Sequence, residues 1–359
     1  SLIDTSLSHL KQQCLNEAGR LSGSKLDEQQ LVSYELAFSS AELAAARTLC
    51  DYAERIRAQR GDRGTESAEL NLEDRFALHF CAEASQNTGA RLSIRLAEFG
   101  LTRAQHQAVF ASEQLINFCE QFQQSSKLAE LGKMMLQQDG RTGDYLLEED
   151  KEIMRESFQR FASDVVAPLA EHIHREDLMI PQEILGPLVE MGCFGLSIPE
   201  QFGGLQPDDR EDNMGMIVVT EELSRGSLAA AGSLITRPEI LSRALLAGGT
   251  QEQKELWLPK LATADPFCAV AITEPDYGSD VAGMKLKAIR VEGGWQLNGS
   301  KTWCTFGGKA GVLLTLARTD PDPGLGHKGL SMFLVEKPAF DGHDFRYEQE
   351  NGGVIAGKA

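Results

Sequence analysis

The sequence predicts a multidomain chain of α and β structure, in which two helical domains precede an antiparallel β domain. The stretch "AELAAARTLCDYAERIRAQR" is typical of residues 1–140, where strong helix formers abound and Gly and Pro are scarce. After Asp265 the pattern changes to short β-branched or alternating segments bounded by Gly, Asp and Pro, which is typical of antiparallel strands. The expected domains are 1–140, 146–262 and 263–359.

Composition narrows the class of protein. A length of 359 residues suits two or three domains, and a hydrophobic fraction of 42% is that of a globular protein. The net charge of -18 disfavours nucleic acids and anionic membrane surfaces, because phosphate binding needs clustered Lys and Arg. No apolar stretch reaches the roughly 18 residues of a membrane span, and the first residues lack a signal-peptide pattern. We therefore expect a cytoplasmic protein with neither a nucleic-acid nor a membrane partner.

The cysteines and histidines indicate no metal site. Seven cysteines are scattered without any CxxC pair, so neither a disulfide framework nor a zinc site is predicted and the thiols should be reduced. His172 and His174 lie two residues apart, which on a helix directs them to different faces.

In the first domain, a polar break at Arg60–Ser67 separates two helical stretches, and Asn71 is placed to cap the second. The glycine-containing segment 137–145, "QQDGRTGDY", is predicted to be a linker.

In the second domain, Met154, Phe158, Phe161 and Val165 are spaced four, three and four residues apart, which predicts one buried helix face. Further helices are expected over 216–227 and 238–261.

In the β domain, strands are expected in "FCAVAIT", "MKLKAIRV", "WQLNGSK", "GVLLTLART" and "GLSMFLVEK". The "EGG" sequence at 292–294 predicts a hairpin turn.

The stretch "AITEPDYGSD", at 271–280, follows an apolar strand. Pro275 should end that strand and hold Glu274 extended, and Gly278 should let the backbone turn without a Cβ penalty. Exposed amides and the Ser279 hydroxyl could bind a phosphate. An ordinary strand-ending turn, with a capping Ser and Asp, is the commoner reading of these residue types.

The stretch "NGSKTWCTFGGKA", at 298–310, has Trp303 and Thr305 alternating, so on a strand they would point to the same face. An indole beside a hydroxyl suits a planar heteroaromatic ligand. Taken alone, a core Trp beside a Thr is the commoner reading.

Together the two stretches resemble, in order and spacing, the flavin-binding signatures of the acyl-CoA dehydrogenase family, TEPxxGSD and K-x-W-I-T-N-G. They stand here at 273–280 and 301–307, and "IPEQFGG", "GGTQEQKELWLPKLATAD" and "GLSMFLVEK" extend the likeness over about 146–337. Tyr277 and Phe306 depart from the commonest pattern, where a small residue and Asn stand.

The resemblance implies FAD bound between a helical and a β domain. Ile272 and Thr273 would contact the pyrimidine end of the flavin, and Ser279 would lie near an FAD phosphate and the bound acyl-CoA. Trp303 would pack on the flavin ring, and Thr305 would hydrogen-bond near N5. The full set of implied cofactor-binding residues is Val270, Ile272, Thr273, Gly278, Ser279, Trp303, Cys304 and Thr305.

The family reaction removes the α-hydrogen of an acyl-CoA as a proton and the β-hydrogen as a hydride to flavin N5. The proton normally goes to a Glu of a C-terminal four-helix domain, which we expect to be absent from this chain. No catalytic base is therefore assigned, and Glu274 is a poor candidate because Pro275 fixes it in the flavin turn. The resemblance also implies electron-transferring flavoprotein as a partner and a homodimer or homotetramer.

A helical extension before Leu146, combined with "SLITRPEI", resembles the methylsuccinyl-CoA dehydrogenase branch of the family, in the ethylmalonyl-CoA pathway. The distal carboxylate of that substrate needs a fixed cation, and Arg237 is the candidate. An equally good reading has Arg237 exposed or paired with Glu239, just before a helix that starts at Pro238.

Two alternatives for the function stay open. One is a dehydrogenase for a short branched chain such as isovaleryl- or isobutyryl-CoA. The other is a flavin-binding or assembly protein without turnover.

Overall fold

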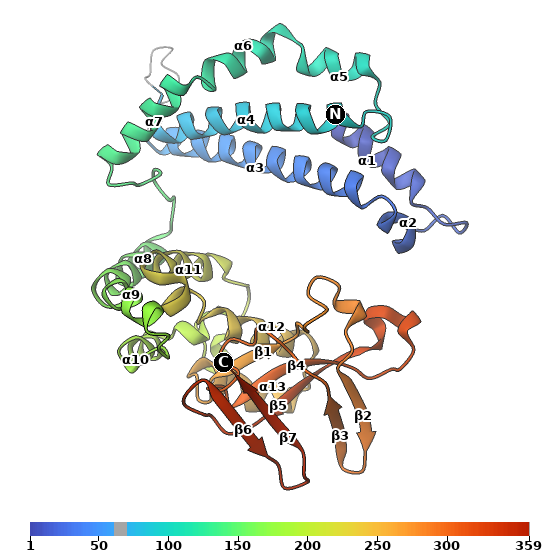
Figure 1. The fold of residues 1–359 in the computed structure, drawn as a ribbon. Coiled ribbons are helices and arrows are strands. Elements are labelled where there is room, and N and C mark those ends of the chain that lie inside the picture. The colour runs from blue at the N-terminus through green and yellow to red at the C-terminus, as the bar shows by residue number, and fades with distance from the viewer. Residues whose placement is uncertain (61–69, 359) are drawn as a thin grey trace. The chain divides into compact units, whose positions relative to one another are not determined.

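The computed structural model describes residues 1–60 and 70–358, so most of the polar break predicted at Arg60–Ser67 lies outside the described residues. The chain folds into two compact units, Ser1–Leu146 and Leu147–Ala359 (Figure 1). Within the described ranges, no helix is both long and apolar enough to cross a membrane.

The first unit is helical, as predicted. Its two longest helices are neighbours, and the shorter ones pack against one or the other of them (Figure 1). The helices are α1 (Leu2–Gln13), α2 (Gly23–Asp27), α3 (Gln30–Arg60), α4 (Leu72–Ile94), α5 (Arg103–Phe110), α6 (Glu113–Phe122) and α7 (Ser125–Gln137). Leu10, Leu36, Leu92 and Phe99 lie in a core that joins α1, α3 and α4.

The predicted cap of α4 is confirmed. The Asn71 side chain accepts a hydrogen bond from the Asp74 amide at 2.8 Å, which satisfies one of the free N–H groups of the first turn. The segment predicted as a linker is held to this end of the helix. The buried Glu73 carboxylate accepts hydrogen bonds from Arg60 at 3.0 Å and from the Asp144 amide at 2.9 Å. Residue 144 is therefore anchored rather than free.

The second unit begins with helices. They are α8 (Glu149–Phe161), α9 (Ala167–Arg175), α10 (Gln182–Glu190), α11 (Asn213–Ser227), α12 (Thr236–Gly248) and α13 (Gln251–Ala262). The predicted helix face is confirmed, because Phe158 is buried in the core with Met154, Phe161 and Val165 packed against it. The π-helical turn Ala162–Val166 joins α8 to α9.

A five-stranded sheet follows, with the order β1-β4-β2-β3 and with β5 also paired to β4. Its strands are β1 (Cys268–Ala271), β2 (Lys287–Val291), β3 (Gly294–Asn298), β4 (Val312–Arg318) and β5 (Leu330–Glu336). A separate hairpin comprises β6 (Asp344–Glu348) and β7 (Val354–Lys358).

The sheet is mixed, which corrects the prediction of a purely antiparallel domain. The β2–β3 hairpin forms at the predicted turn, and β4 pairs antiparallel with β5. However, β1 pairs in parallel with β4, with Cys268 opposite Val312 and Ala271 opposite Thr315. A parallel pair needs a long connection, and the intervening hairpin and loops provide it. Strand periodicity alone does not report such a connection.

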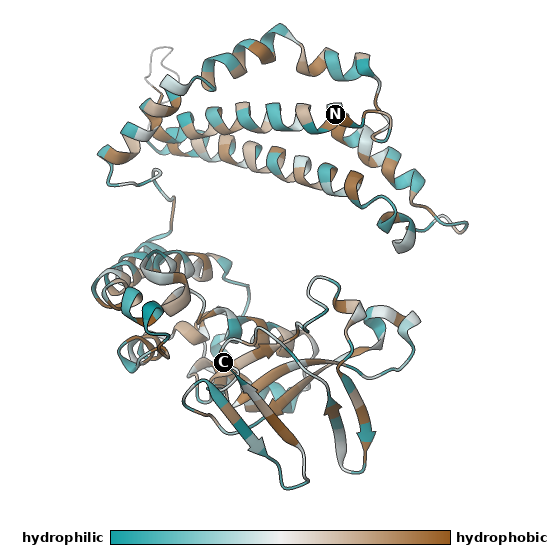
Figure 2. Cartoon of the chain, in the orientation of Figure 1, coloured by the Kyte–Doolittle hydropathy of each residue, from teal (hydrophilic) through white to brown (hydrophobic). Residues whose placement is uncertain are grey.

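One face of this sheet is covered by α12 and α13. Leu241, Leu245, Trp257 and Leu258 of the helices pack against Cys268, Val312 and Leu314 of β1 and β4. The central strand β4 is hydrophobic along most of its length (Figure 2). This packing fixes the end of β1, where the first predicted motif begins.

Candidate functional site

The two predicted motifs lie side by side. The first begins where β1 ends at Ala271, with Val270 still inside the strand. The amide of Thr302 donates a hydrogen bond to the Thr273 carbonyl at 2.8 Å, so the second motif runs against the first. Residues almost thirty positions apart in the sequence therefore belong to one surface.

A buried ion pair fastens the two motifs together. The Glu274 carboxylate accepts hydrogen bonds from the Lys285 amide at 2.7 Å, the Leu286 amide at 2.8 Å and Lys301 Nζ at 3.0 Å. Lys301 Nζ also donates to the Ile272 carbonyl at 2.8 Å. Only 6% of the Glu274 side chain and 5% of the Lys301 side chain are exposed. Sequence reasoning missed this pair, although both residues stand in the quoted motifs.

The groups around Glu274 keep its carboxylate ionised and use its oxygens as hydrogen-bond acceptors. Burial acts to raise the pKa of this carboxyl, but the two backbone amides and Lys301 outweigh burial and hold the pKa below its ordinary value. Its oxygens already accept three hydrogen bonds, so this carboxylate is a weak proton acceptor. Glu274 therefore has a structural role in the turn.

The turn after Glu274 closes on itself. The Glu274 amide donates to the Tyr277 carbonyl at 2.9 Å, and the Tyr277 amide donates to the Glu274 carbonyl at 3.1 Å. Two of the amides that sequence reasoning offered to an anion are thus already used. Asp280 caps the following turn by accepting from the Gly283 amide at 3.1 Å, and Ser279 is exposed beside it.

The backbone role predicted for Gly278 is wrong, while its place among the implied cofactor-binding residues stays a prediction. Its backbone does not adopt a positive φ, and a Cβ added there would meet no atom within 4 Å. An L-residue would therefore fit at this position.

The predicted strand through Trp303 and Thr305 is also wrong. After β3 ends at Asn298, the backbone takes a positive φ of 58° at Trp303 and of 63° at Phe306, so the chain turns instead of alternating. The alternative of a core Trp is wrong too, because Trp303 is 86% exposed. A bulky aromatic side chain held in a left-handed backbone, with no packing of its own to explain it, is a candidate ligand contact.

Phe306 behaves differently from Trp303. It is half-buried, its ring centroid lies 6.3 Å from that of Phe267, and Phe267 packs edge-on against Phe194 at 5.5 Å. Phe306 thus links the core of the helices to the core of the sheet. This contact accounts for an aromatic residue where the resemblance led us to expect Asn.

Arg237 reaches Thr305 from α12. Its Nη2 donates to Thr305 Oγ1 at 2.8 Å, and its Nη1 donates to the Ser233 carbonyl at 2.7 Å and to Thr236 Oγ1 at 2.5 Å. Burial lowers the pKa of this guanidinium from its ordinary value, because the group is partly desolvated. The structure thus brings together two residues that were predicted for different ligands.

The alternative prediction, in which Arg237 precedes the helix and is exposed or paired with Glu239, is wrong. It lies inside α12 and is half-buried rather than exposed. Glu239 forms its salt bridge with Arg243, at 3.2 Å.

The loop after Phe306 is held by Lys337, which sequence reasoning missed as a site residue. Its buried ammonium donates to the carbonyls of Gly308 and Ala310, each at 2.6 Å, and of Pro338 at 3.0 Å. Burial lowers the pKa of Lys337 to about 8. The only signal in the sequence is its place at the end of "GLSMFLVEK".

The remaining predicted residue of the second motif is Cys304. It is half-buried, and its Sγ lies 3.7 Å from the Thr302 carbonyl oxygen. Burial raises the pKa of this thiol.

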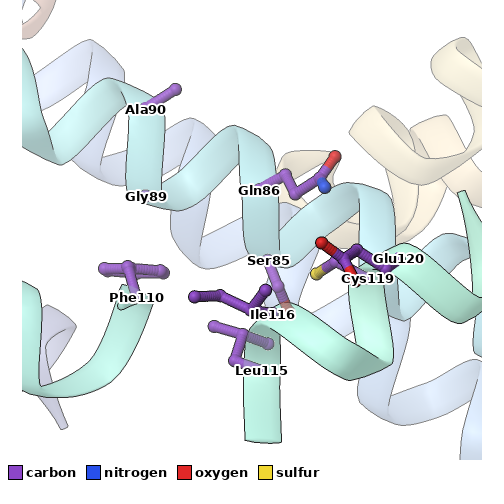
Figure 3. Close-up of a pocket in the computed structure, with 9 residues that line it drawn as sticks. All are labelled: Ser85, Gln86, Gly89, Ala90, Phe110, Leu115, Ile116, Cys119 and Glu120. Carbon is purple, nitrogen blue, oxygen red and sulfur yellow. The ribbon is translucent and has the colours of Figure 1, made fainter. Parts of the chain in front are cut away.

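A separate groove in the first unit lies between α4, α5 and α6 and has a volume of about 360 Å³ (Figure 3). Phe110, Leu115 and Ile116 form an apolar part of its lining, and Gln86 and Glu120 lie toward the other end (Figure 3). None of the residues predicted for the site lines this groove.

Two sequence-family comparisons match the second unit. Residues 148–265 match the N-terminal domain of acyl-CoA dehydrogenase, and residues 269–354 match its middle domain. The chain belongs to the acyl-CoA dehydrogenase family.

Several individual proteins are similar to this chain. The chain is 34% identical to (2S)-methylsuccinyl-CoA dehydrogenase of Cereibacter sphaeroides, over 99% of this chain and 63% of that protein. It is 39% identical to a mitochondrial 2-methylacyl-CoA dehydrogenase of Solanum tuberosum, over 54% of this chain and 45% of that protein. A solved glutaryl-coenzyme A dehydrogenase–glutaryl-CoA complex is 33% identical, covers 58% of this chain and 51% of its own, and has a TM-score of 0.49. The chain thus spans about half to two thirds of the length of these relatives.

Proposed function

We propose that this chain binds FAD and takes part in the α,β-dehydrogenation of an acyl-CoA thioester. The observation that carries the proposal is the junction of the two motifs, where the exposed Trp303 stands beside Thr305. Membership of the acyl-CoA dehydrogenase family supports it.

The residues present fit a flavin. The Trp303 indole offers an exposed flat wall against which an isoalloxazine ring can pack. Because Thr305 Oγ1 accepts a hydrogen bond from Arg237, its own hydrogen is free to be donated to a ring nitrogen. Bound FAD would supply the hydride acceptor for the reaction. Ser279 is exposed at the end of the first motif, and we propose that it hydrogen-bonds a phosphate or the acyl-CoA.

The tasks of this chain's own residues follow from their contacts. Glu274 and Lys301 hold the two motifs in register, and Lys337 fixes the loop behind Phe306. Arg237 orients the Thr305 hydroxyl. We assign no residue of this chain as the proton acceptor. The proposed electron acceptor is electron-transferring flavoprotein, and the proposed assembly is a homodimer or homotetramer.

For the substrate, we propose (2S)-methylsuccinyl-CoA, which would become mesaconyl-CoA. The methylsuccinyl-CoA dehydrogenase of C. sphaeroides aligns with 99% of this chain, including the first unit. Arg237 supplies the chemical argument, because it is a partly desolvated cation that pairs with no carboxylate among the described residues. A carboxylate at the far end of an acyl group could occupy that place.

Calorimetric titration tests the substrate proposal. Arg237→Gln should weaken binding of methylsuccinyl-CoA by about 10- to 100-fold, since a hydrogen bond to a charged group contributes about 1.5–3 kcal/mol, and should change butyryl-CoA binding far less. Arg243→Gln is the matched control, because Arg243 lies on the same helix but pairs with Glu239 and Glu211. An equal loss for both ligands in Arg237→Gln would remove the case for a carboxylated substrate and favour a short branched acyl-CoA.

A further inference from the structure

Two cysteines of the first unit meet across neighbouring helices. Cys50 lies in α3 and Cys81 in α4, and their Sγ atoms are 3.3 Å apart. They are separated by 31 positions in the sequence. Both are half-buried, and Cys81 Sγ also lies 3.8 Å from the carbonyl oxygen of Ala46. Packing of α3 against α4 therefore creates a dithiol that the spacing of the cysteines did not reveal.

The geometry brings the sulfur atoms close to bonding distance. A disulfide has an S–S length near 2.05 Å, so the two atoms need to approach by about 1.3 Å, a shift within the reach of small side-chain rotations. Within the part of the chain that the structure describes, this is the only recorded thiol–thiol contact. The other five cysteines are Cys14, Cys119, Cys193, Cys268 and Cys304, and the first four of these are buried.

We propose that Cys50 and Cys81 form an oxidation site that a peroxide converts to a disulfide linking α3 to α4. The Cys50 sulfur attacks one peroxide oxygen, the O–O bond breaks, and Cys50 becomes a sulfenic acid while water leaves. Cys81 sulfur then attacks the Cys50 sulfur, the S–O bond breaks, and the hydroxyl leaves as a second water with the Cys81 proton. The two thiols lose two electrons, and the peroxide gains them.

The order of the two steps follows from the environment of Cys81. Burial, followed by the contact with Cys50, raises the pKa of Cys81 to about 12. We assign the first attack to Cys50, because the Cys81 thiol can donate to the Ala46 carbonyl oxygen 3.8 Å away, which favours its less reactive protonated form.

The disulfide would have a structural consequence. It closes a ring through the α3–α4 connection and limits the freedom of the unfolded chain, so oxidation should stabilise the first unit. This proposal concerns the first unit and is independent of the proposed flavin chemistry.

Peptide mapping after treatment of the full chain with dilute hydrogen peroxide tests the proposal. We expect a linked peptide pair that contains Cys50 and Cys81, two of the seven thiols lost to alkylation, and full recovery with dithiothreitol. The thermal midpoint of the first unit should rise by about 5–10 °C on oxidation. Cys50→Ser and Cys81→Ser should each abolish the link and the rise, and Cys119→Ser, in α6, should keep both.

Peptide mapping of the oxidised wild-type protein tests the proposal even if a cysteine variant folds poorly. The proposal is overturned if native protein keeps all seven thiols under conditions that link Cys50 to Cys81 in the same chain unfolded in guanidinium. It is also overturned if the cross-links that form in the native protein join other cysteines.

Discussion

Arg237 Nη2 lies 2.8 Å from Thr305 Oγ1, so a cation on α12 holds the hydroxyl that the family resemblance places near flavin N5. The contact joins the helical part of the second unit to the turn of the second motif, across 68 positions of sequence. It makes Thr305 an acceptor from the protein and leaves its hydrogen for a ligand.

Variants of Thr305 should distinguish the contribution of its hydroxyl group from that of its methyl group, and Thr305→Val removes the hydroxyl. Val removes the acceptor of a hydrogen bond at an exposed position, where water can take its place, so the loss should be about 0.5–1.5 kcal/mol of the free energy of unfolding. It should also weaken FAD binding. Thr305→Ser keeps the oxygen and should retain most of both properties. Urea unfolding and FAD titration measure the two effects, and a Ser variant as impaired as the Val variant would show that the methyl group matters instead.

Replacing Trp303 should affect FAD binding and spare stability, whereas replacing Phe306, three residues later, should lower stability. Trp303 is 86% exposed, so Trp303→Ala should change the free energy of unfolding by no more than about 0.5 kcal/mol while lowering FAD affinity at least tenfold. Phe306→Ala removes a half-buried ring from the contact with Phe267 and should cost on the order of 2 kcal/mol. Denaturant curves and FAD titrations of both variants provide the comparison. A large loss of stability in Trp303→Ala would mean that this residue packs in the fold.

Replacing only one residue of the Glu274–Lys301 ion pair should lower the stability of the fold strongly. Glu274→Gln or Lys301→Met leaves a buried charge without its partner, and each should lower the free energy of unfolding by about 3–5 kcal/mol. The double variant should cost less than the sum of the two single changes, because no lone charge remains. A double-mutant cycle by urea unfolding at neutral pH measures this coupling, and simple additivity would argue against it.

The stability that this ion pair contributes should also depend on pH. The folded-state pKa of Glu274 lies below its ordinary value of 4.5, so its stabilising effect is complete above that value and is lost as the pH falls through the folded-state pKa. The stability difference between wild type and Glu274→Gln should therefore shrink as the pH is lowered below 4.5. Equal slopes of stability against pH for the two proteins would show that Glu274 does not titrate differently on folding.

Lys337 should show a pH dependence of the same sign, at alkaline rather than acidic pH. Its pKa falls from 10.5 to about 8 on folding, so the unfolded chain binds more protons between these values. The contribution of Lys337 to stability should consequently rise as the pH increases through this window. Urea unfolding of wild type and Lys337→Met across the window should show the gain in the wild type alone. A parallel dependence in both proteins would assign it to other groups.

Local signals in the sequence predicted much of this molecule. The Asn71 cap, the buried face that contains Phe158 and the β2–β3 hairpin depend on residues close together in the chain, and each is confirmed. The adjacency of the two motifs needed the family resemblance. Contacts between distant residues could not be predicted, because periodicity specifies which face a residue occupies and not its partner. Arg237 with Thr305 and Cys50 with Cys81 are of this kind.

The wrong predictions of backbone conformation and strand pairing also have physical causes. Trp303 and Phe306 adopt positive φ values that bulky residues rarely take, so no propensity or alternation pattern predicts the turn there. Gly278, the glycine expected to let the backbone turn, does not adopt a positive φ. The parallel pairing of β1 with β4 likewise depends on a connection and not on the composition of either strand.

Titration of the purified full chain with FAD, followed by visible absorption and fluorescence, tests whether a flavin binds at the junction of the two motifs. We expect saturable binding of one FAD per chain, with quenching of the flavin fluorescence by the adjacent indole, and binding at least tenfold weaker in Trp303→Ala. Saturable binding that is unchanged in Trp303→Ala, or no binding by the folded wild-type protein, would contradict this expectation.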